Sequence, residues 1–286
     1  MKYLVVGASG MVGHLIGVYL EEAGHDVVGY SRRPSPLSHH VQGDLYDLDL
    51  LKETIVEGYF DAVVNAAGLL VKDCEEHPDR AAFINGFIPH FLAKTVDESK
   101  TKVIQLSTDC IFRGNTGPYA EDSTPDGIEF YSLTKHTGEI TYGRHLTLRN
   151  SVVGPDISEG GIGLLNWFMK QSGTIDGWDC AIWTGLTTLE LAKVIEYAVE
   201  HDASGLVNMV PEGPGISKYE LLQLFNTYFR HGTADIVHTN YFVSDKTLVR
   251  TNFDMDYRVP AYEQMVMELA QWVRDHKALY PDYYIQ

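Results

Sequence analysis

The amino terminus carries the feature that most constrains the fold, a glycine-rich turn between an apolar run and an amphipathic helix. Tyr3–Val6 read as a buried parallel strand, and glycines spaced three apart follow at Gly7, Gly10 and Gly13. Helical spacing of apolar residues begins at once after them. In this context glycines let the backbone approach a pyrophosphate, and free N–H groups of the first helical turn face the anion. The stretch predicts a Rossmann-type, doubly wound α/β fold that binds a dinucleotide; a glycine turn without a ligand is the alternative.

The composition excludes several classes of function. The 286 residues are 44% hydrophobic, enough for a large α/β domain with a smaller lobe. With 22 basic and 39 acidic residues the formal net charge is −17, which argues against nucleic-acid binding. No apolar run approaches the roughly 20 residues of a membrane span, and no signal peptide precedes the first strand, so we expect a cytoplasmic protein. Cys74, Cys110 and Cys180 and the histidines lack metal-ligand spacing, so reduced thiols and no metal are expected.

The end of the second predicted strand, Asp26–Tyr30, bears on the type of cofactor. A site selective for NAD usually places an acidic residue there, whereas Ser31, Arg32 and Arg33 follow this strand. Two guanidiniums and a hydroxyl suit a 2′-phosphate. We therefore predict NADP(H) in preference to NAD(H), and two solvated surface arginines are the alternative.

Two further strand ends are predicted to lie beside the cofactor. Asp44, with Leu45, ends a short predicted strand, where it either accepts from the adenine amino group or acts as a helix cap or turn residue. A later strand ends in small residues that let the backbone lie against ribose and phosphates. The predicted cofactor contacts up to this point are Gly7, Ser9, Gly10, Met11, Val12, Gly13, Ser31, Arg32, Arg33, Asp44, Leu45, Ala66, Ala67 and Gly68.

The chemistry rests on Tyr131 and Lys135, which share one face of a predicted helix. A phenol has a pKa of about 10, and a neighbouring ammonium lowers it. The tyrosine can then give a proton to a carbonyl oxygen as hydride reaches the carbon. Thr108 follows a buried strand at the edge where open α/β sheets place ligands, and can hydrogen-bond the same oxygen. A Tyr-x-x-x-Lys pair alone is common by chance, but this order of motifs is much more specific.

Together these motifs resemble the extended short-chain dehydrogenases/reductases, most of all the dTDP-4-dehydrorhamnose reductase group and its nucleotide-sugar reductase relatives. The matching stretches are 7–13, 65–68, 106–114, 131–139 and 148–154. The resemblance covers essentially the whole chain and is strongest up to Gly154. It implies that Thr108, Tyr131 and Lys135 are the catalytic triad and that Lys135 also contacts the nicotinamide ribose. Asn85 matches a helix asparagine that such enzymes use structurally, and it joins Tyr131 and Lys135 among the expected residues of the cofactor site.

The resemblance also implies how the chain is divided. Residues 1–155 are expected to form an NADP-binding Rossmann domain to which 178–210 return, and 156–177 and 211–286 a smaller substrate-binding lobe interleaved with it. The expected substrate contacts are Thr108, Asp109, Arg149, Trp183 and Arg250. For Trp183 a place in the core or a lid is the alternative, and for Arg250 a solvated charge. Helices are predicted over His77–Glu98, Ile216–Tyr228 and Tyr262–Tyr280.

The resulting hypothesis is NADPH-dependent reduction of a keto group on a nucleotide-activated deoxysugar in polysaccharide biosynthesis, with Tyr131 as general acid. One alternative is an epimerase or dehydratase of the same fold that retains NAD(P). The other is a non-catalytic regulatory subunit similar to the β subunit of methionine adenosyltransferase. The expected partner is the small-molecule substrate, without nucleic acid or membrane, and a homodimer is the general expectation for a soluble enzyme.

Overall fold

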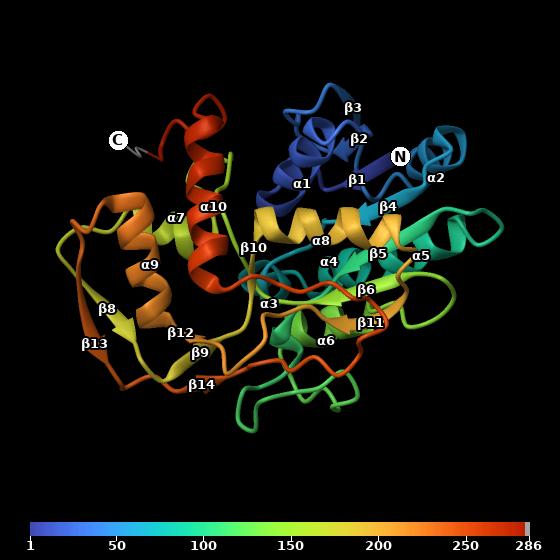
Figure 1. Cartoon of the computed structure of the whole chain (residues 1–286). Helices are drawn as coiled ribbons and strands as arrows, with labels where there is room; N and C mark the ends of the chain where they lie inside the picture. Colours follow the sequence, from blue (N-terminus) through green and yellow to red (C-terminus); the bar gives the residue numbers. More distant parts are fainter. Residues whose placement is uncertain (284–286) are drawn as a thin grey trace.

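The computed structural model describes residues 1–283, whose centre is a seven-stranded parallel sheet with helices on both faces (Figure 1). In chain order its strands are β1 (Lys2–Val6), β2 (Asp26–Ser31), β3 (His39–Gln42), β4 (Ala62–Asn65), β5 (Lys102–Leu106), β6 (Leu146–Arg149) and β11 (Gly205–Asn208). Their spatial order is β11-β6-β5-β4-β1-β2-β3. Successive strands thus build outward in one direction from β1 and then in the other from β4. The predicted Rossmann-type, doubly wound fold is confirmed.

The alternation of side chains along β1 explains the two helical layers. The flanking helices are α1 (Met11–Glu22), α2 (Leu48–Gly58), α5 (Ile88–Thr95), α6 (Phe130–Thr137) and α8 (Thr188–Glu200). Tyr3 and Val5 belong to a core that includes apolar residues of α1 and α8. Leu4 and Val6 belong to a second core with residues of α2 and α5. Because both faces of β1 are covered, the strand is a continuous apolar run in the sequence.

The helix predicted over His77–Glu98 is divided into α4 (Pro78–Ala81), a π-helix η1 (Ala82–Phe87) and α5. A short helix, α3 (Val71–Glu76), precedes them. Pro89 is the physical reason for the wider turn, since it lacks the N–H that a continuous α-helix would pair with the carbonyl of Asn85. The π-helix therefore places Asn85 at an irregular turn, where its side chain is only 2% exposed.

A smaller lobe lies beside the sheet and is built from later segments (Figure 1, left). Its elements are α7 (Gly163–Met169), β8 (Thr174–Trp178), β9 (Ala181–Trp183), β12 (Ile216–Ser217), α9 (Lys218–Arg230), β13 (Asp235–Thr239), β14 (Ser244–Asp245) and α10 (Tyr262–Asp275). Strand β8 pairs with β13, and β9 pairs with both β12 and β14. Strand β9 therefore belongs with lobe strands, although it lies in the 178–210 stretch expected to return to the dinucleotide domain. Of that stretch, β11 does join the main sheet.

The lobe shares its core with the sheet. Phe168 of α7 and Phe225 of α9 belong to the same cluster of buried side chains as α1 and α8. A short parallel pair, β7 (Val152–Val153) with β10 (Leu186–Thr187), joins the two parts. Helix α9 begins at Lys218 rather than at the predicted Ile216 because Ser217 forms a capping box with Glu220.

None of the helices in residues 1–283 has both the length and the apolar character needed to cross a membrane.

Candidate active site

Two adjoining cavities lie at the carboxyl ends of the paired strands β1 and β4. From these two strands the sheet is extended in opposite directions. The register aligns these ends, with Val6 opposite both Tyr30 and Asn65. The larger cavity has a volume of about 360 Å³ and the smaller about 180 Å³. Both are lined by Gly10 and by residues 66–69, so they form one elongated crevice. This is the topological switch point at which open α/β sheets bind ligands.

The glycine turn fits a pyrophosphate. A Cβ on Gly7, whose φ is +88°, would lie 2.7 Å from the Ala67 nitrogen, and one on Gly13 would lie 2.3 Å from the Gly7 oxygen. These two glycines are required by the close approach of the protein's own backbone. A Cβ on Gly10 would meet only the Gly7 oxygen at 3.4 Å, and Gly10 lines both cavities. The residues present thus fit a dinucleotide, with the open N-terminus of α1 turned toward the crevice.

Most of the predicted cofactor contacts line this crevice, and two of them, Gly13 and Asn85, do not. Those around the smaller cavity are Gly7, Ser9, Gly10, Ser31, Arg32, Arg33, Asp44, Leu45, Ala66, Ala67 and Gly68. Met11 and Val12 line the larger cavity. Gly13 lines neither cavity and lies where α1 packs against the turn, and its contact with a cofactor stays a prediction.

The turn after β2 presents two exposed guanidiniums to the smaller cavity. Ser31 donates to the Arg33 carbonyl over 2.8 Å and lies 3.0 Å from His40 Nε2, so its hydroxyl also shapes the turn itself. Arg32 and Arg33 are exposed, and Arg33 donates to Ser158 Oγ at 3.2 Å. In the described residues neither guanidinium is paired with a carboxylate.

Asp44 has the local contacts of a turn residue. Its carboxylate accepts from the Tyr46 backbone nitrogen at 3.1 Å, and the cap of α2 is Asp47, which accepts from the Leu50 nitrogen. Asp44 nevertheless lines the smaller cavity. The helix-cap alternative for Asp44 is therefore excluded, while its proposed contact with adenine stays a prediction.

The larger cavity brings together the three predicted catalytic side chains, Thr108, Tyr131 and Lys135, with Asp109 beside them. Thr108 Oγ1 accepts from the Cys110 nitrogen and donates to Asp109 Oδ1, both over 3.1 Å. Lys135 is 7% exposed and donates to the Leu106 carbonyl over 2.6 Å. Hydrogen bonds thus hold Thr108 and Lys135 in place, and Tyr131 lines the same cavity from the first turn of α6.

The electrostatics of this group differ from the expectation. Burial raises the pKa of the Tyr131 phenol, and a hydrogen bond with the Thr108 side chain acts in the opposite direction. Burial also lowers the pKa of Lys135 to about 8, while the Glu139 carboxylate favours the charged ammonium. Desolvation of the phenol thus outweighs the lowering expected from Lys135, and Tyr131 is protonated at neutral pH.

Asn85 supports the crevice instead of lining it. Its side-chain oxygen accepts from the Leu69 nitrogen at 2.8 Å, and its amide donates to the Leu69 carbonyl at 3.2 Å and to Thr134 Oγ1 at 3.4 Å. Leu69 lines both cavities. Asn85 therefore holds the segment after β4 against α6, which agrees with the structural use that the resemblance implies, and its direct contact with a cofactor stays a prediction.

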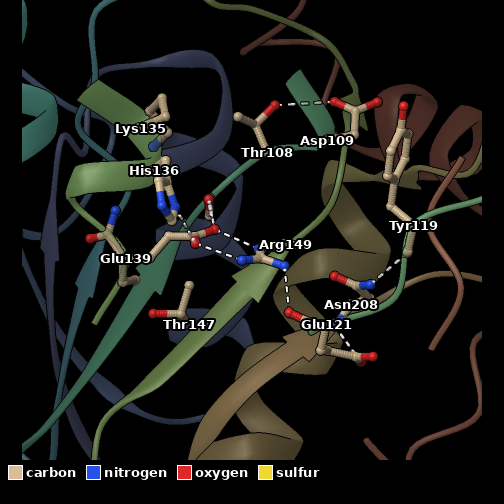
Figure 2. A network of polar contacts seen from close by, with 12 residues as sticks. Thr108, Asp109, Tyr119, Glu121, Lys135, His136, Glu139, Thr147, Arg149 and Asn208 are labelled. Atoms are coloured by element: carbon tan, nitrogen blue, oxygen red, sulfur yellow. Dashed lines mark hydrogen bonds and ion pairs between the residues drawn. The ribbon is translucent and has the colours of Figure 1, made fainter. Parts of the chain in front are cut away.

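Three predicted substrate contacts lie outside the crevice. Arg149 forms a buried ion pair with Glu139, and the two side chains are 3% and 2% exposed (Figure 2). Trp183 is 3% exposed and its ring lies 5.8 Å from that of Tyr262, as its core alternative predicts. Arg250 donates to the backbone carbonyls of Asn252, Met255 and Tyr257. Arg149 and Trp183 are thus held by contacts within the core, and Arg250 by carbonyls of the segment that follows it in the chain.

Some cavity residues were not predicted. They include Leu69, Leu70, Val71, Cys110, Asn150, Ser151, Val152 and Leu191. Asn150 and Ser151 directly follow the parallel strand β6. Their position at the carboxyl end of a strand could have predicted that they lie at the ligand site. Leu191 comes from α8, and no local pattern in the sequence connects it with the site.

One group with the residue types of a metal site lies elsewhere. Ligand atoms of His25, Glu196 and Glu200 lie within 4.8 Å of one another. His25 and Glu196 already pair at 2.8 Å, and Tyr19 donates to Glu196 at 2.7 Å. Contacts within the protein therefore account for the arrangement.

Comparisons with known proteins find reductases among the relatives of this chain. Among curated relatives, a probable low-salt glycan biosynthesis reductase, Agl14, of Haloferax volcanii is 36% identical over 143 residues, 49% of this chain and 48% of the relative. A dTDP-4-dehydrorhamnose reductase of Streptomyces griseus is 34% identical over 140 residues, 48% of this chain and 43% of the relative. The chain thus spans about half the length of the curated relatives it matches.

The fold as a whole matches solved structures. The Bacillus anthracis dTDP-4-dehydrorhamnose reductase in complex with NADP superposes with a TM-score of 0.78 at 17% identity. The superposition covers 94% of this chain and 98% of that one. The family model described as RmlD substrate binding domain matches residues 1–156, more than half of the chain. On that match, and with the crevice and its glycine turn in the matched residues, the chain belongs to the RmlD substrate-binding-domain family.

Proposed function

We propose that this protein is an NADPH-dependent reductase that acts on a keto group of a nucleotide-activated deoxysugar. The observation that carries the proposal is that Thr108, Tyr131 and Lys135 line one cavity, which adjoins the crevice of the glycine turn. The membership of the family and the reductases among the relatives support it.

The chain's own residues explain the proton side of the reaction. A bound nicotinamide dinucleotide supplies the hydride. The Thr108 hydroxyl turns its one proton from Asp109 to the keto oxygen and holds that oxygen by a hydrogen bond, and Tyr131 gives the same oxygen its proton. Because burial raises the pKa of Tyr131, the phenol carries the proton that reduction consumes. The Lys135 ammonium then stabilises the phenolate that forms.

The preference for NADPH is part of the proposal. Arg32 and Arg33 line the smaller cavity and are exposed, and no acidic residue follows β2 in their place. A guanidinium fork suits the 2′-phosphate that distinguishes NADPH from NADH. The glycine turn and the small residues Ala66–Gly68 would hold the remainder of the dinucleotide.

The direct test is consumption of NADPH with dTDP- and UDP-linked 4-keto-6-deoxysugars. We expect turnover with at least one of them, and Tyr131→Phe is expected to lower kcat by about 10²–10⁴-fold because the proton donor is lost. Tyr142→Phe is the matched control, since Tyr142 is 51% exposed and lines neither cavity. Absence of turnover with every sugar, or an unchanged rate for Tyr131→Phe, overturns the proposal.

The same preparation separates the alternatives. An epimerase or dehydratase would retain its dinucleotide through purification and convert the sugar without net change in NADPH. A regulatory subunit would form a stable complex with a second protein and show no reductase activity. Either result replaces the reductase proposal.

A further inference from the structure

A buried ion pair lies directly behind the larger cavity. Glu139 accepts from Arg149 Nε over 2.6 Å and from Arg149 Nη2 over 2.8 Å. Ser107 Oγ donates to the same carboxylate at 2.7 Å, and His136 Nδ1 lies 3.1 Å from it. Figure 2 shows Glu139 and Arg149 facing each other between His136 and Glu121. One carboxylate thus connects the end of β5, the end of α6 and strand β6.

The network continues into the lobe side of the molecule. Arg149 Nη1 donates to the Glu121 carbonyl over 3.0 Å. The Glu121 carboxylate accepts from the Asn208 nitrogen at 2.9 Å and from the Thr251 nitrogen at 2.8 Å. The loop before α6, the end of β11 and the segment after β14 are therefore held by the same chain of contacts.

The Glu139–Arg149 ion pair does not contact the proposed catalytic residues directly. It is connected to Thr108 and Lys135 through residues next to them in the chain. Ser107 immediately precedes Thr108, so the bond from Ser107 to Glu139 holds the backbone from which Thr108 extends. Glu139 lies two residues beyond Thr137, the last residue of α6, which also carries Lys135. Both side chains are held at the end of β5, where Ser107 donates to the Glu139 carboxylate and the Leu106 carbonyl accepts from the Lys135 ammonium.

We propose that the Glu139–Arg149 ion pair is a positioning element of the active site. The hydrogen bond from Ser107 to Glu139 positions Thr108, and the negative charge of the Glu139 carboxylate keeps the Lys135 side chain protonated. The inference rests on the proposed reductase function and extends it to residues that do not touch the substrate. Arg149 sets the strength of this effect, because it neutralises part of the carboxylate's charge.

The surroundings of Lys135 leave Glu139 as its main anionic neighbour among the described residues. Cys74 of α3 is the second group that favours the charged ammonium, and burial raises the pKa of that thiol, so it stays neutral. The other titratable or charged groups of the cavity and of the elements packed against α6 include Tyr131, His136, Asp109, Cys110 and Arg149, and α3 adds Lys72, Asp73, Glu75 and Glu76.

The test replaces the pair by apolar residues of similar size in Glu139→Met/Arg149→Met. Exchanging both members of a buried ion pair often leaves stability unchanged, whereas losing one leaves an unpaired charge. We expect a thermal midpoint close to wild type but kcat/KM lower by about 10- to 100-fold, as for a misplaced catalytic group. Lys193→Met/Glu268→Met is the control, because it removes a pair that is 30% and 29% exposed on α8 and α10.

A second readout does not depend on turnover. In protein labelled with 13C at lysine Cε, assigned with Lys135→Arg, the pKa of Lys135 is measured directly by its shift with pH. We expect a lower pKa in Glu139→Met/Arg149→Met and an unchanged one in the control. Ser107→Ala is expected to lower kcat several-fold without moving this pKa, since it loosens only the strand.

The outcomes separate the two proposals. A folded double variant with the wild-type pKa of Lys135 and wild-type kcat/KM overturns the positioning role. If the double variant does not fold, Glu139→Gln, which keeps the acceptor for Ser107, is judged by the same pKa criterion. If the wild type turns over no sugar, the reductase proposal fails, and the Lys135 titration still decides the electrostatic part.

Discussion

Lys135 donates from its side-chain nitrogen to the backbone carbonyl of Leu106 over 2.6 Å, and this bond holds the ammonium of α6 at the end of β5. The carbonyl orients the ammonium but carries no full charge to stabilise it. Burial therefore lowers the pKa of Lys135 to about 8, within reach of ordinary assay conditions. Two elements far apart in the chain thus define the position and the charge of one side chain.

The rate of reduction should fall as the pH rises through the pKa of Lys135. The ammonium stabilises the phenolate left by proton transfer, so its deprotonation above a pKa of about 8 removes that stabilisation. We expect kcat/KM to decline by about tenfold per pH unit on this alkaline limb. Lys135→Arg keeps the charge at high pH, so any activity it retains should lack the limb. A wild-type profile that stays flat across this range contradicts the role of Lys135.

The two arginines after β2 should determine the choice of cofactor. Arg32→Ala/Arg33→Ala removes both exposed guanidiniums from the smaller cavity. We expect the Kd for NADPH, measured by fluorescence titration, to rise by about 10- to 100-fold, because charge-assisted hydrogen bonds to phosphate are lost. The Kd for NADH should change little.

Arg274→Ala on α10 is the control for that experiment, since among residues 1–283 the guanidinium of Arg274 donates to Gln271 of its own helix and lines neither cavity. Equal weakening of NADH and NADPH binding would show that the arginines do not read the 2′-phosphate.

Two glycines three residues apart should respond differently to the same substitution. Gly13→Ala would bring a Cβ to 2.3 Å from the Gly7 oxygen, so we expect a loss of about 1–3 kcal/mol in the free energy of unfolding. Gly10→Ala meets only one atom, at 3.4 Å, but extends into the crevice. It should leave the thermal midpoint nearly unchanged and weaken dinucleotide binding. Similar midpoints for the two variants would contradict this division of roles.

His14 should make the fold sensitive to acid. It is fully buried between the Gly10 carbonyl at 2.8 Å and the Tyr280 hydroxyl at 2.9 Å. Burial lowers its pKa below the ordinary 6.5, so the unfolded chain binds a proton before the folded one does. Stability is complete above about pH 6.5 and falls toward the folded pKa by up to about 1.4 kcal/mol per pH unit.

Urea unfolding of wild type and His14→Gln between about pH 7 and 5 measures this contribution. The variant should be less stable at pH 7 and should lose less on acidification. Parallel slopes for the two proteins would assign the acid sensitivity to other groups.

The parts of the site that could be predicted are those in which neighbouring residues carry the signal. The glycines of the turn are required by contacts between Gly7 and Gly13, six residues apart. Tyr131 and Lys135 share a helix face by their spacing alone. Thr108 follows a strand, and parallel strands end at one edge, so its convergence with them was predictable.

The predictions that differ from the structure concern side chains whose hydrogen-bond partners come from other elements of the fold. In the sequence, Arg149 resembles a cation that could bind the substrate. In the structure its guanidinium donates to the Glu139 carboxylate and to the Glu121 carbonyl. The structural use of Asn85 was expected, but only the fold shows that the π-helix Ala82–Phe87 turns its side chain to Leu69. A buried charge or amide takes whichever partner packing offers, and no local pattern encodes that choice.

By itself the sequence determined the doubly wound sheet, the dinucleotide turn and the Thr108, Tyr131 and Lys135 set, because hydrophobic period, glycine spacing and helical pitch act over a few residues. Only the tertiary structure decided that burial raises the pKa of Tyr131 and lowers that of Lys135, since desolvation depends on every element packed around a group. It also decided that Arg149 and Glu139 stand behind the cavity as a pair, because their contact joins a strand to the end of a helix.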